Sequence, residues 1–252
     1  MKRFTYLSLV LSVAAMLGSW TNTRAADPKL SETIDLLAGK PEETWRTVDA
    51  GWIFSDTVVV DPMKANRLSA KPVTGGTIWV NGKTGRLKDL ITKKTFGDCQ
   101  VHIEFFLAKG SNSGIKFHAV YEIQIEDIYG VPDAKLKGEH CGGIYPRSVQ
   151  DPNYRHIDDG IAPKLNACKK PGEWQTLDVT FRTVRLNEKG EKTSNAMIER
   201  AELNGKLIHD HQEMKTPTGA NWKIKEKTAG PFMLQADHGP VAVRKLTITP
   251  IK

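Results

Sequence analysis

The sequence predicts an all-β protein, a β-sandwich or jelly roll built from many short strands. From Trp52 onward, apolar and polar residues alternate with period two, which is the pattern of half-buried strands. The alternating segments are short and are separated by Gly, Pro and Asn, as in sandwich and jelly-roll proteins. No helical segments alternate with them, so a doubly wound parallel sheet is not expected.

The elements are expected in the following order along the chain. Ser31 is a suitable N-cap for one short helix over 32–37. Strands are then expected at 79–80, 99–106, 115–125 (one strand or a bent pair), 174–184, 197–208, 232–235 and 241–248. Asn204-Gly205 between apolar flanks is the clearest hairpin signal. Residues 146–173 show little periodicity and are expected to form a long loop over one rim or face of the sandwich, where loops often carry function.

Length and composition exclude several classes of protein. With 252 residues, 39% hydrophobic and 26% charged, the chain is neither disordered nor collagen-like nor a disulfide-framed miniprotein. A chain of this length can bury a sizeable core without covalent cross-links.

The first 25 residues are expected to be a signal peptide. Lys2 and Arg3 precede an apolar run, and 23–25 offers a small-x-small cleavage site. A membrane anchor is the alternative, but the apolar run is short for a span of about 20 residues. We therefore expect a secreted or periplasmic protein without a membrane span after signal removal, with an N-terminal extension at 26–47 and a β-sandwich domain at 48–252.

Net charge bears on the kind of partner, and the cysteines bear on disulfides and metal binding. Loss of Lys2, Arg3 and Arg24 leaves 33 basic residues against 29 acidic ones, a net charge of +4, with no basic cluster, so nucleic acid is not expected as a partner. Cys99 lies in an alternating run and is expected in the core. The other two cysteines, Cys141 and Cys168, lie in irregular sequence and could form a disulfide or remain free. No Cys/His spacing indicates structural zinc.

The segment 121–126 is the most informative for function. Alternation places Tyr121, Ile123 and Ile125 on one face and Glu122, Gln124 and Glu126 on the other. Successive residues on one face of a strand stand about 7 Å apart, so these polar groups could reach one sugar-sized ligand together. An ordinary solvated sheet face is the alternative. Small and polar residues flank the strand at 110–114, which includes Asn112, and at 127–130.

Two further features bear on catalysis. The spacing Glu122-x-Gln124-x-x-Asp127 is similar to the paired carboxylates of retaining β-sandwich glycosidases, although the middle position is an amide here. Asp127 would share the side of Glu122 only if the strand carried a bulge. His238, in the turn Asp237-His238-Gly239, could serve as general acid or base, although such a turn taken alone is more often structural.

Other residues are weaker candidates. Tyr145 lies in a loop and could form a platform for a sugar ring, whereas Trp174 at a strand start is expected in the core. His209 and His211 could ligate a metal, but we favour a surface hairpin end for them.

The order of these motifs resembles that of the 3-keto-disaccharide hydrolase family. The matching segments are Gly110-Ser111-Asn112-Ser113-Gly114-Ile115, 121–124 with Asp127 and Tyr129-Gly130, 143–145, 171–175, 203–205, 218–219, 230–231, 234–235 and 237–241. The resemblance spans about residue 50 to the C-terminus. It implies a concanavalin-like jelly roll of two antiparallel sheets, a ligand groove on the concave face, and carbohydrate chemistry outside the cytoplasm. Residues 115–118 and 243–246 depart from the family's usual residues.

The reaction that this resemblance implies is cleavage of the glycosidic bond of a sugar oxidised at C3. The C3 carbonyl makes the C2 proton acidic, so a base removes it and the C1 substituent leaves with help from an acid. The expected acid and base groups are Glu122, Asp127 and His238. The expected substrate-binding residues are Glu104, Asn112, Gln124, Tyr145 and Gln235. No cofactor is certain from the sequence, and a divalent metal is a candidate.

Three hypotheses follow for the function. The favoured one is a secreted enzyme that cleaves oxidised glucosides or disaccharides, by elimination and hydration or by hydrolysis. The second is a non-catalytic carbohydrate-binding module on the same scaffold. The third is an adhesion or structural sandwich domain, which would have no groove and would bind no sugar.

Overall fold

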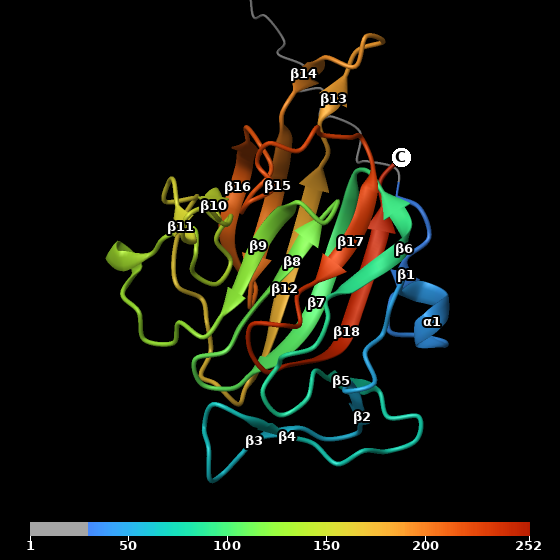
Figure 1. The fold of residues 1–252 in the computed structure, drawn as a ribbon, viewed down its shortest axis with the longest axis vertical. Coiled ribbons are helices and arrows are strands. Elements are labelled where there is room, and N and C mark those ends of the chain that lie inside the picture. The colour runs from blue at the N-terminus through green and yellow to red at the C-terminus, as the bar shows by residue number, and fades with distance from the viewer. Residues whose placement is uncertain (1–29) are drawn as a thin grey trace, which may run out of the picture.

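The structure is a computed structural model that describes residues 30–252; the expected signal peptide at 1–25 lies outside the described residues. Two antiparallel sheets lie face to face and enclose the core between them (Figure 1). This arrangement confirms the predicted all-β sandwich of two antiparallel sheets.

The larger sheet has eight strands and lies behind the smaller one in Figure 1. Seven follow the order β16-β15-β12-β7-β18-β5-β2, and β1 pairs with β18 beside them. Their bounds are β1 Ile34–Asp35, β2 Ile53–Ser55, β5 Ile78–Val80, β7 Cys99–Leu107, β12 Trp174–Arg182, β15 Ala196–Leu203, β16 Lys206–Met214 and β18 Val241–Pro250.

The smaller sheet has four strands in the order β6-β17-β8-β9, namely β6 Leu90–Phe96, β17 Gly230–Leu234, β8 Asn112–Phe117 and β9 Tyr121–Glu126. Short pairs complete the fold: β3 Val59–Val60 with β4 Leu68–Ser69, β10 Ser148–Val149 with β11 Arg155–His156, and β13 Arg185–Leu186 with β14 Lys192–Ser194. The β13–β14 hairpin projects from one end of the molecule (Figure 1). The helices are α1 Pro41–Thr44 and a 3₁₀ turn, η1 Asp133–Lys135.

Alternation explains how the two sheets share one core. On β7, Val101, Ile103 and Phe105 are buried, while the residues between them lie on the other face. The rings of Phe117 on β8 and Phe181 on β12 stack across the two sheets with centroids 4.4 Å apart. Each fully buried side chain of this size contributes about 1.5–3 kcal/mol, so the period-two pattern of the sequence corresponds to the main stabilising surface.

The predicted turns and strands agree with the structure, but the predicted helix does not. Asn204 and Gly205 join β15 and β16 with φ values of 53° and 73°, the left-handed pair that a tight hairpin needs. The helix predicted at 32–37 is wrong. This segment contains β1, and Leu36 donates its N–H to Leu246 O and is buried. Pairing with β18 outweighs a weak local helix preference, and the helix forms instead at 41–44, where Pro41 occupies its first turn.

The outer face of the four-stranded sheet is covered by loops, and this cover creates the site. Residues 142–145 hydrogen-bond along the edge of β9: Gln124 N–H donates to Gly143 O (2.9 Å) and Tyr145 N–H donates to Glu122 O (3.1 Å). The expected loop region 146–173 continues from there. In consequence both faces of β9 are buried up to Ile125, although its sequence alternates. The polar face of β9, which carries Glu122 and Gln124, is therefore buried under loops and is not the ordinary solvated sheet face that was the alternative.

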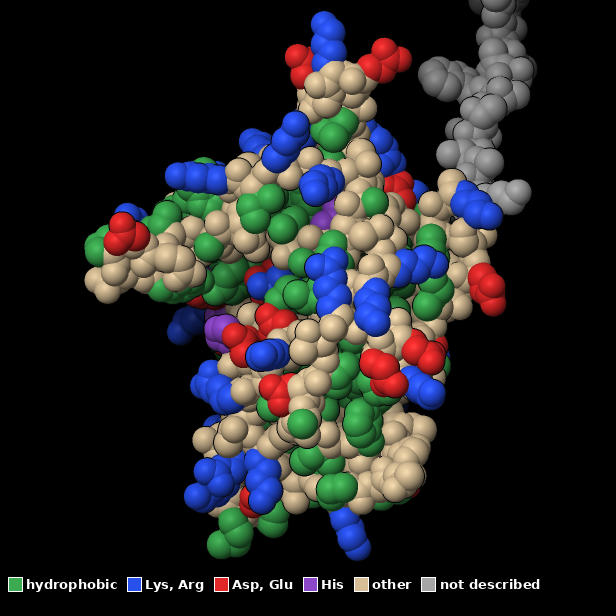
Figure 2. Space-filling view, turned by 45° about the vertical axis from the view of Figure 1, so that its right-hand side comes forward, with side chains coloured by type: hydrophobic (Ala, Val, Ile, Leu, Met, Phe, Trp, Pro, Cys, Tyr) green, Lys and Arg blue, Asp and Glu red, His purple; other side chains and the backbone are tan. Residues whose placement is uncertain are grey.

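The surface carries both signs of charge. On the face shown in Figure 2, Lys and Arg side chains are interspersed with Asp and Glu, and neither sign forms a continuous field over that view.

Candidate functional site

A cavity of about 570 Å³ lies between the outer face of the four-stranded sheet and the loops that cover it. Side chains from β8 and β9 form part of its wall, together with loop residues from 145–154, 219–221 and 235–238. The lining residues are Asn112, Lys116, Glu122, Gln124, Tyr145, Ser148, Gln150, Tyr154, Gly219, Ala220, Asn221, Gln235 and His238. The volume suits a sugar-sized ligand.

A buried ion pair is the central feature of the cavity. Lys116 on β8 and Glu122 on β9 are directly opposite in the sheet register, and Lys116 Nζ lies 3.0 Å from Glu122 Oε2. Only 4% of the Glu122 side chain and 15% of the Lys116 side chain are exposed. Burial raises the pKa of Glu122, and the charge and hydrogen bond of Lys116 oppose that rise.

The backbone leaves room for this carboxylate at Gly114. A Cβ on Gly114 would lie 2.6 Å from Glu122 Oε1, closer than any side-chain contact allows. Gly114 stands opposite Gln124 in the register, two positions along β8 from Lys116 and on the same face. The glycine therefore lets the Glu122 side chain lie flat across β8.

Unpartnered hydrogen-bonding atoms surround the ion pair. Gln124 Oε1, Gln235 Oε1 and Ser148 Oγ are all buried, and none has a partner within the protein. All three residues line the cavity. Buried polar atoms without a partner are uncommon, because each one costs about 1–3 kcal/mol unless water or a ligand satisfies it. The cavity is therefore suited to a ligand rich in hydroxyl groups.

His238 lies at the wall of the cavity, on a turn whose backbone is hydrogen-bonded to the buried side chain of Asn81. Asn81 Nδ2 donates to Ala236 O (3.0 Å) and to Gly239 O (2.9 Å), and Asn81 Oδ1 accepts from Val241 N–H (2.7 Å). This buried amide fixes both ends of the turn. The His238 side chain is 54% exposed, and its Nδ1 hydrogen-bonds to Asp237 Oδ1. The Nε2 atom is therefore the nitrogen available to a ligand or to water.

Six of the eight residues predicted from the sequence line this one cavity: Asn112, Glu122, Gln124, Tyr145, Gln235 and His238. The other two, Asp127 and Glu104, do not.

Asp127 closes a turn instead of facing the ligand. Its Oδ2 accepts from Gly110 N–H (2.8 Å) and its Oδ1 accepts from Tyr129 N–H (3.2 Å). The β8–β9 pairing runs without a register shift from Asn112↔Glu126 to Phe117↔Tyr121, so the bulge that would have brought Asp127 to the side of Glu122 is not there. Asp127 therefore lies outside the residues that line this cavity, and its expected role as an acid or base has no support from the geometry.

Glu104 lies on the other sheet. It belongs to β7, where its Oε2 accepts from Arg244 Nε (2.6 Å) and its Oε1 lies 3.5 Å from His102 Nε2. Alternation along β7 directs Glu104 away from the core and so to the outside of the eight-stranded sheet, on the opposite side of the sandwich from the cavity. Glu104 is therefore not brought together with the other expected substrate-binding residues.

Sequence reasoning missed Lys116, Ser148, Gln150, Tyr154 and Asn221 as cavity residues. Lys116 had a usable signal, since it lies two positions after Gly114 on the polar side of an alternating strand. The other four belong to loops or, for Ser148, to the short strand β10, and no local pattern indicates where these segments cross the sheet.

The residues at the site do not fit a divalent metal. Among residues 30–252, no group of three or more His, Cys, Asp or Glu side chains is arranged to hold a metal ion. The carboxylate at the cavity centre, Glu122, already has Lys116 as its partner. His209 and His211 also point to different surroundings: His209 is buried and bonds to Gly142 O through Nε2 (2.7 Å), whereas His211 is exposed and bonds to Asp210.

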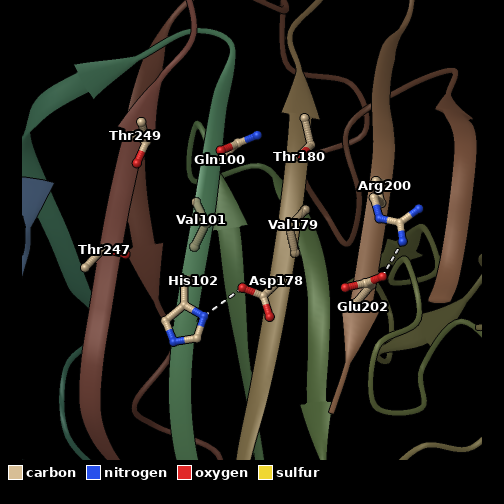
Figure 3. A pocket seen from close by; sticks show the side chains of 10 residues that line it. All are labelled: Gln100, Val101, His102, Asp178, Val179, Thr180, Arg200, Glu202, Thr247 and Thr249. Atoms are coloured by element: carbon tan, nitrogen blue, oxygen red, sulfur yellow. Dashed lines mark hydrogen bonds and ion pairs between the residues drawn. The ribbon is translucent and has the colours of Figure 1, made fainter. Parts of the chain in front are cut away.

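A second hollow, of about 300 Å³, lies on the outer face of the eight-stranded sheet (Figure 3). Its charged side chains are paired with one another: His102 Nδ1 lies 2.7 Å from Asp178 Oδ1, and Arg200 bonds to Glu202. The charged groups of this hollow therefore already have partners, whereas the cavity over the four-stranded sheet holds buried polar atoms without any.

One structural finding bears on membranes: across residues 30–252, no helix has the length and apolar character that a bilayer span needs.

Comparison with known proteins places the chain in a family. The model of the 3-keto-alpha-glucoside-1,2-lyase-like domain matches residues 32–249. Two crystal structures of candidate glycosyl hydrolases from Parabacteroides distasonis are similar in fold. The first has a TM-score of 0.55 and 20% identity, covering 94% of this chain and 99% of that one. The second has a TM-score of 0.53 and 18% identity, covering 87% and 100%. No curated protein matches the chain.

Proposed function

We propose that this chain, which belongs to the 3-keto-alpha-glucoside-1,2-lyase-like family, cleaves the glycosidic bond of 3-keto-glucosides by acid/base chemistry. The observation that carries the proposal is the buried Lys116–Glu122 pair at the centre of a cavity whose other buried polar atoms lack partners. A binding module needs hydroxyl partners, but it does not need a buried carboxylate with a raised pKa.

Glu122 is the proposed base that removes the C2 proton. A base works best when its pKa lies near the working pH, and burial raises the pKa of Glu122 in that direction. The proton to be removed is acidic only because the C3 carbonyl can take up the electron pair as an enolate. This requirement explains why an oxidised sugar would react and the parent sugar would not.

Lys116 is the proposed group that stabilises the enolate. Its ammonium lies 3.0 Å from the Glu122 carboxylate, so it is close to wherever the C2 proton is removed. When Glu122 takes the proton and becomes neutral, the charge of Lys116 becomes available to the developing oxyanion in a site with little water. In this proposal one member of the ion pair, Glu122, accepts the C2 proton, and the other, Lys116, stabilises the enolate that remains.

The remaining lining groups bind the sugar and admit water. Gln124, Gln235 and Ser148 offer buried acceptors to hydroxyl groups, and Tyr145 offers an aromatic ring. His238, more exposed at the wall, is placed to activate the water that adds to C1 once the bond is broken. We propose further that the protein acts outside the cytoplasm, as its N-terminal sequence indicates.

The test uses purified protein with a 3-keto-α-glucoside and with the unoxidised glucoside. We expect cleavage of the first alone, and in D₂O we expect deuterium to enter at C2. Glu122→Gln should lower kcat at least about 100-fold, the usual contribution of a general base. Glu202→Gln, the same change on the outer face of the eight-stranded sheet, is the matched control and should leave kcat unchanged.

Two results would count against the proposal. Full activity of Glu122→Gln would remove the carboxylate from the reaction. Calorimetric binding of a sugar with no cleavage of any 3-keto-glucoside would instead support the carbohydrate-binding module.

A further inference from the structure

A hydrogen-bonded chain of side chains runs through the loop wall of the cavity. Tyr145 Oη and Tyr154 Oη are 2.7 Å apart, and both lie near His156 Nε2, at 3.1 and 3.0 Å. The other ring nitrogen, His156 Nδ1, lies 3.2 Å from Glu139 Oε2. Both nitrogens of the imidazole are therefore engaged, one by a carboxylate and the other by two phenols.

The two ends of this chain face different spaces. Tyr145 and Tyr154 line the cavity that holds Glu122 and Lys116. His156 and Glu139 line a separate depression of about 310 Å³ beside Lys137, Pro146 and 157–159. A proton entering at the depression could therefore reach the cavity without passing the substrate.

The backbone holds the chain in place. Ser148 on β10 pairs with His156 on β11, and the His156 ring lies against the Tyr145 ring with centroids 5.2 Å apart. Arg147 Nε bonds to Asp158 Oδ2 (2.5 Å) and clamps the same hairpin from its other side. The loop between Tyr145 and His156 is thus anchored at both ends.

Tyr145 is present as the neutral phenol and therefore holds a proton that it can give. Burial raises the pKa of Tyr145, and its hydrogen bond with Tyr154 and the negative charges of Glu122 and Glu139 raise it further. A phenol in such surroundings remains protonated near neutral pH. Its tyrosinate would be strongly basic and would at once take a proton from a neighbour.

We propose that Tyr145 is the general acid that protonates the leaving oxygen of the glycosidic bond, with His156 and Glu139 as positioning residues that return its proton. This inference rests on the proposed function, because it supplies the acid that bond cleavage requires.

The proton balance closes in one cycle. As the C1–O bond breaks, its electron pair stays on the leaving oxygen, which takes the phenolic proton of Tyr145. The tyrosinate then takes the proton from His156 Nε2, directly or through Tyr154, while His156 Nδ1, on the side of Glu139, takes up a proton from water in the outer depression. Proton exchange with water afterwards returns the imidazole to its starting tautomer. The C2 proton leaves separately through Glu122.

The test compares two substrates that share one sugar and differ in the leaving group: methyl 3-keto-α-glucoside and 4-nitrophenyl 3-keto-α-glucoside. Methoxide needs a proton in order to leave, whereas 4-nitrophenolate does not. Tyr145→Phe should lower kcat/KM at least about 100-fold on the methyl glucoside and less than about 5-fold on the aryl glucoside. His156→Gln and Glu139→Gln should show the same selectivity with smaller losses, of about 10-fold.

The leaving-group dependence separates this role from a structural one. Tyr129→Phe removes an exposed phenol that does not line the cavity, and it should change neither rate. Equal losses on both substrates for Tyr145→Phe, or no loss on either, would overturn the acid assignment while leaving the proposed function standing. Wild-type protein that cleaves neither substrate would refute the proposed function itself, and with it any acid role for Tyr145.

Discussion

Replacing Lys116 with Met should make the stability of the protein depend more steeply on pH. The change removes the partner of a carboxylate whose side chain is only 4% exposed and lies 3.0 Å from the ammonium. An unpaired buried charge costs about 3–5 kcal/mol, so Glu122 in the variant should avoid that cost by staying protonated in the folded state. Its pKa, already raised by burial, should rise further once Lys116 no longer opposes the shift.

The direction of the effect follows from proton binding. Between the unfolded value of about 4.3 and the folded pKa, the folded protein holds a proton that the unfolded chain has released. Stability therefore falls as pH rises through that window, by about 1.4 kcal/mol per pH unit for one group, and becomes constant above the folded pKa. The wild-type protein should show a narrower window, because Lys116 limits the rise in the pKa of Glu122.

Urea unfolding at pH 5, 6, 7 and 8 measures this effect. The Lys116→Met variant is compared with the double variant Lys116→Met/Glu122→Gln, in which no carboxyl remains to titrate and all other groups are the same. The free-energy difference between the two should change by about 1 kcal/mol or more per pH unit over part of this range. Parallel stability curves for the two proteins would refute the reasoning, because they would show that Glu122 titrates alike in the folded and unfolded chains.

Three further predictions concern neighbouring features. Gly114→Ala should displace the Glu122 carboxylate, since the new methyl group would lie 2.6 Å from Oε1, and should lower kcat about 10-fold or more while circular dichroism still shows a folded protein. Burial raises the pKa of Glu126 to about 7, so the free energy of unfolding should fall as pH rises from 5 to 7. Glu126→Gln should flatten that fall in urea titrations, and an unchanged pH profile in the variant would contradict the raised pKa. Cys141 and Cys168 are both free thiols, and Cys141 is near enough to raise the pKa of the Cys168 thiol. Mild oxidation should therefore join them, with a mass loss of two hydrogen atoms and a gain of about 3 kcal/mol in stability; free thiols after oxidation would exclude the bridge.

Predictions from the sequence were most accurate for side-chain directions that depend only on the local geometry of a strand. Glu122 and Gln124 were predicted to share a face because alternation along a strand is a property of the backbone, and they do. The expectation for Asp127 depended on the same local geometry. Placing it beside Glu122 required a bulge, and the regular β8–β9 register contains none.

Other parts of the site were beyond sequence reasoning because they depend on contacts distant in the chain. Tyr145 and Gln235 were predicted to share a site only through the resemblance to a family. Tyr154 and His156 carried no signal, since their roles arise from where the loop crosses the sheet. Glu104 was misplaced because an alternating strand shows that two faces exist but not which sheet of the sandwich it joins.

By itself, the sequence determined that this is an all-β sandwich and which side chains of each strand face the core, because the pleat repeats every two residues. Tertiary structure alone decided that the polar face of β9 is buried under loops, that Lys116 meets Glu122 there, and that a phenol–imidazole–carboxylate chain lies in the cavity wall. The physical reason is that burial and charge pairing are properties of the closed fold. They come from segments that meet only when the two sheets and their covering loops have packed together.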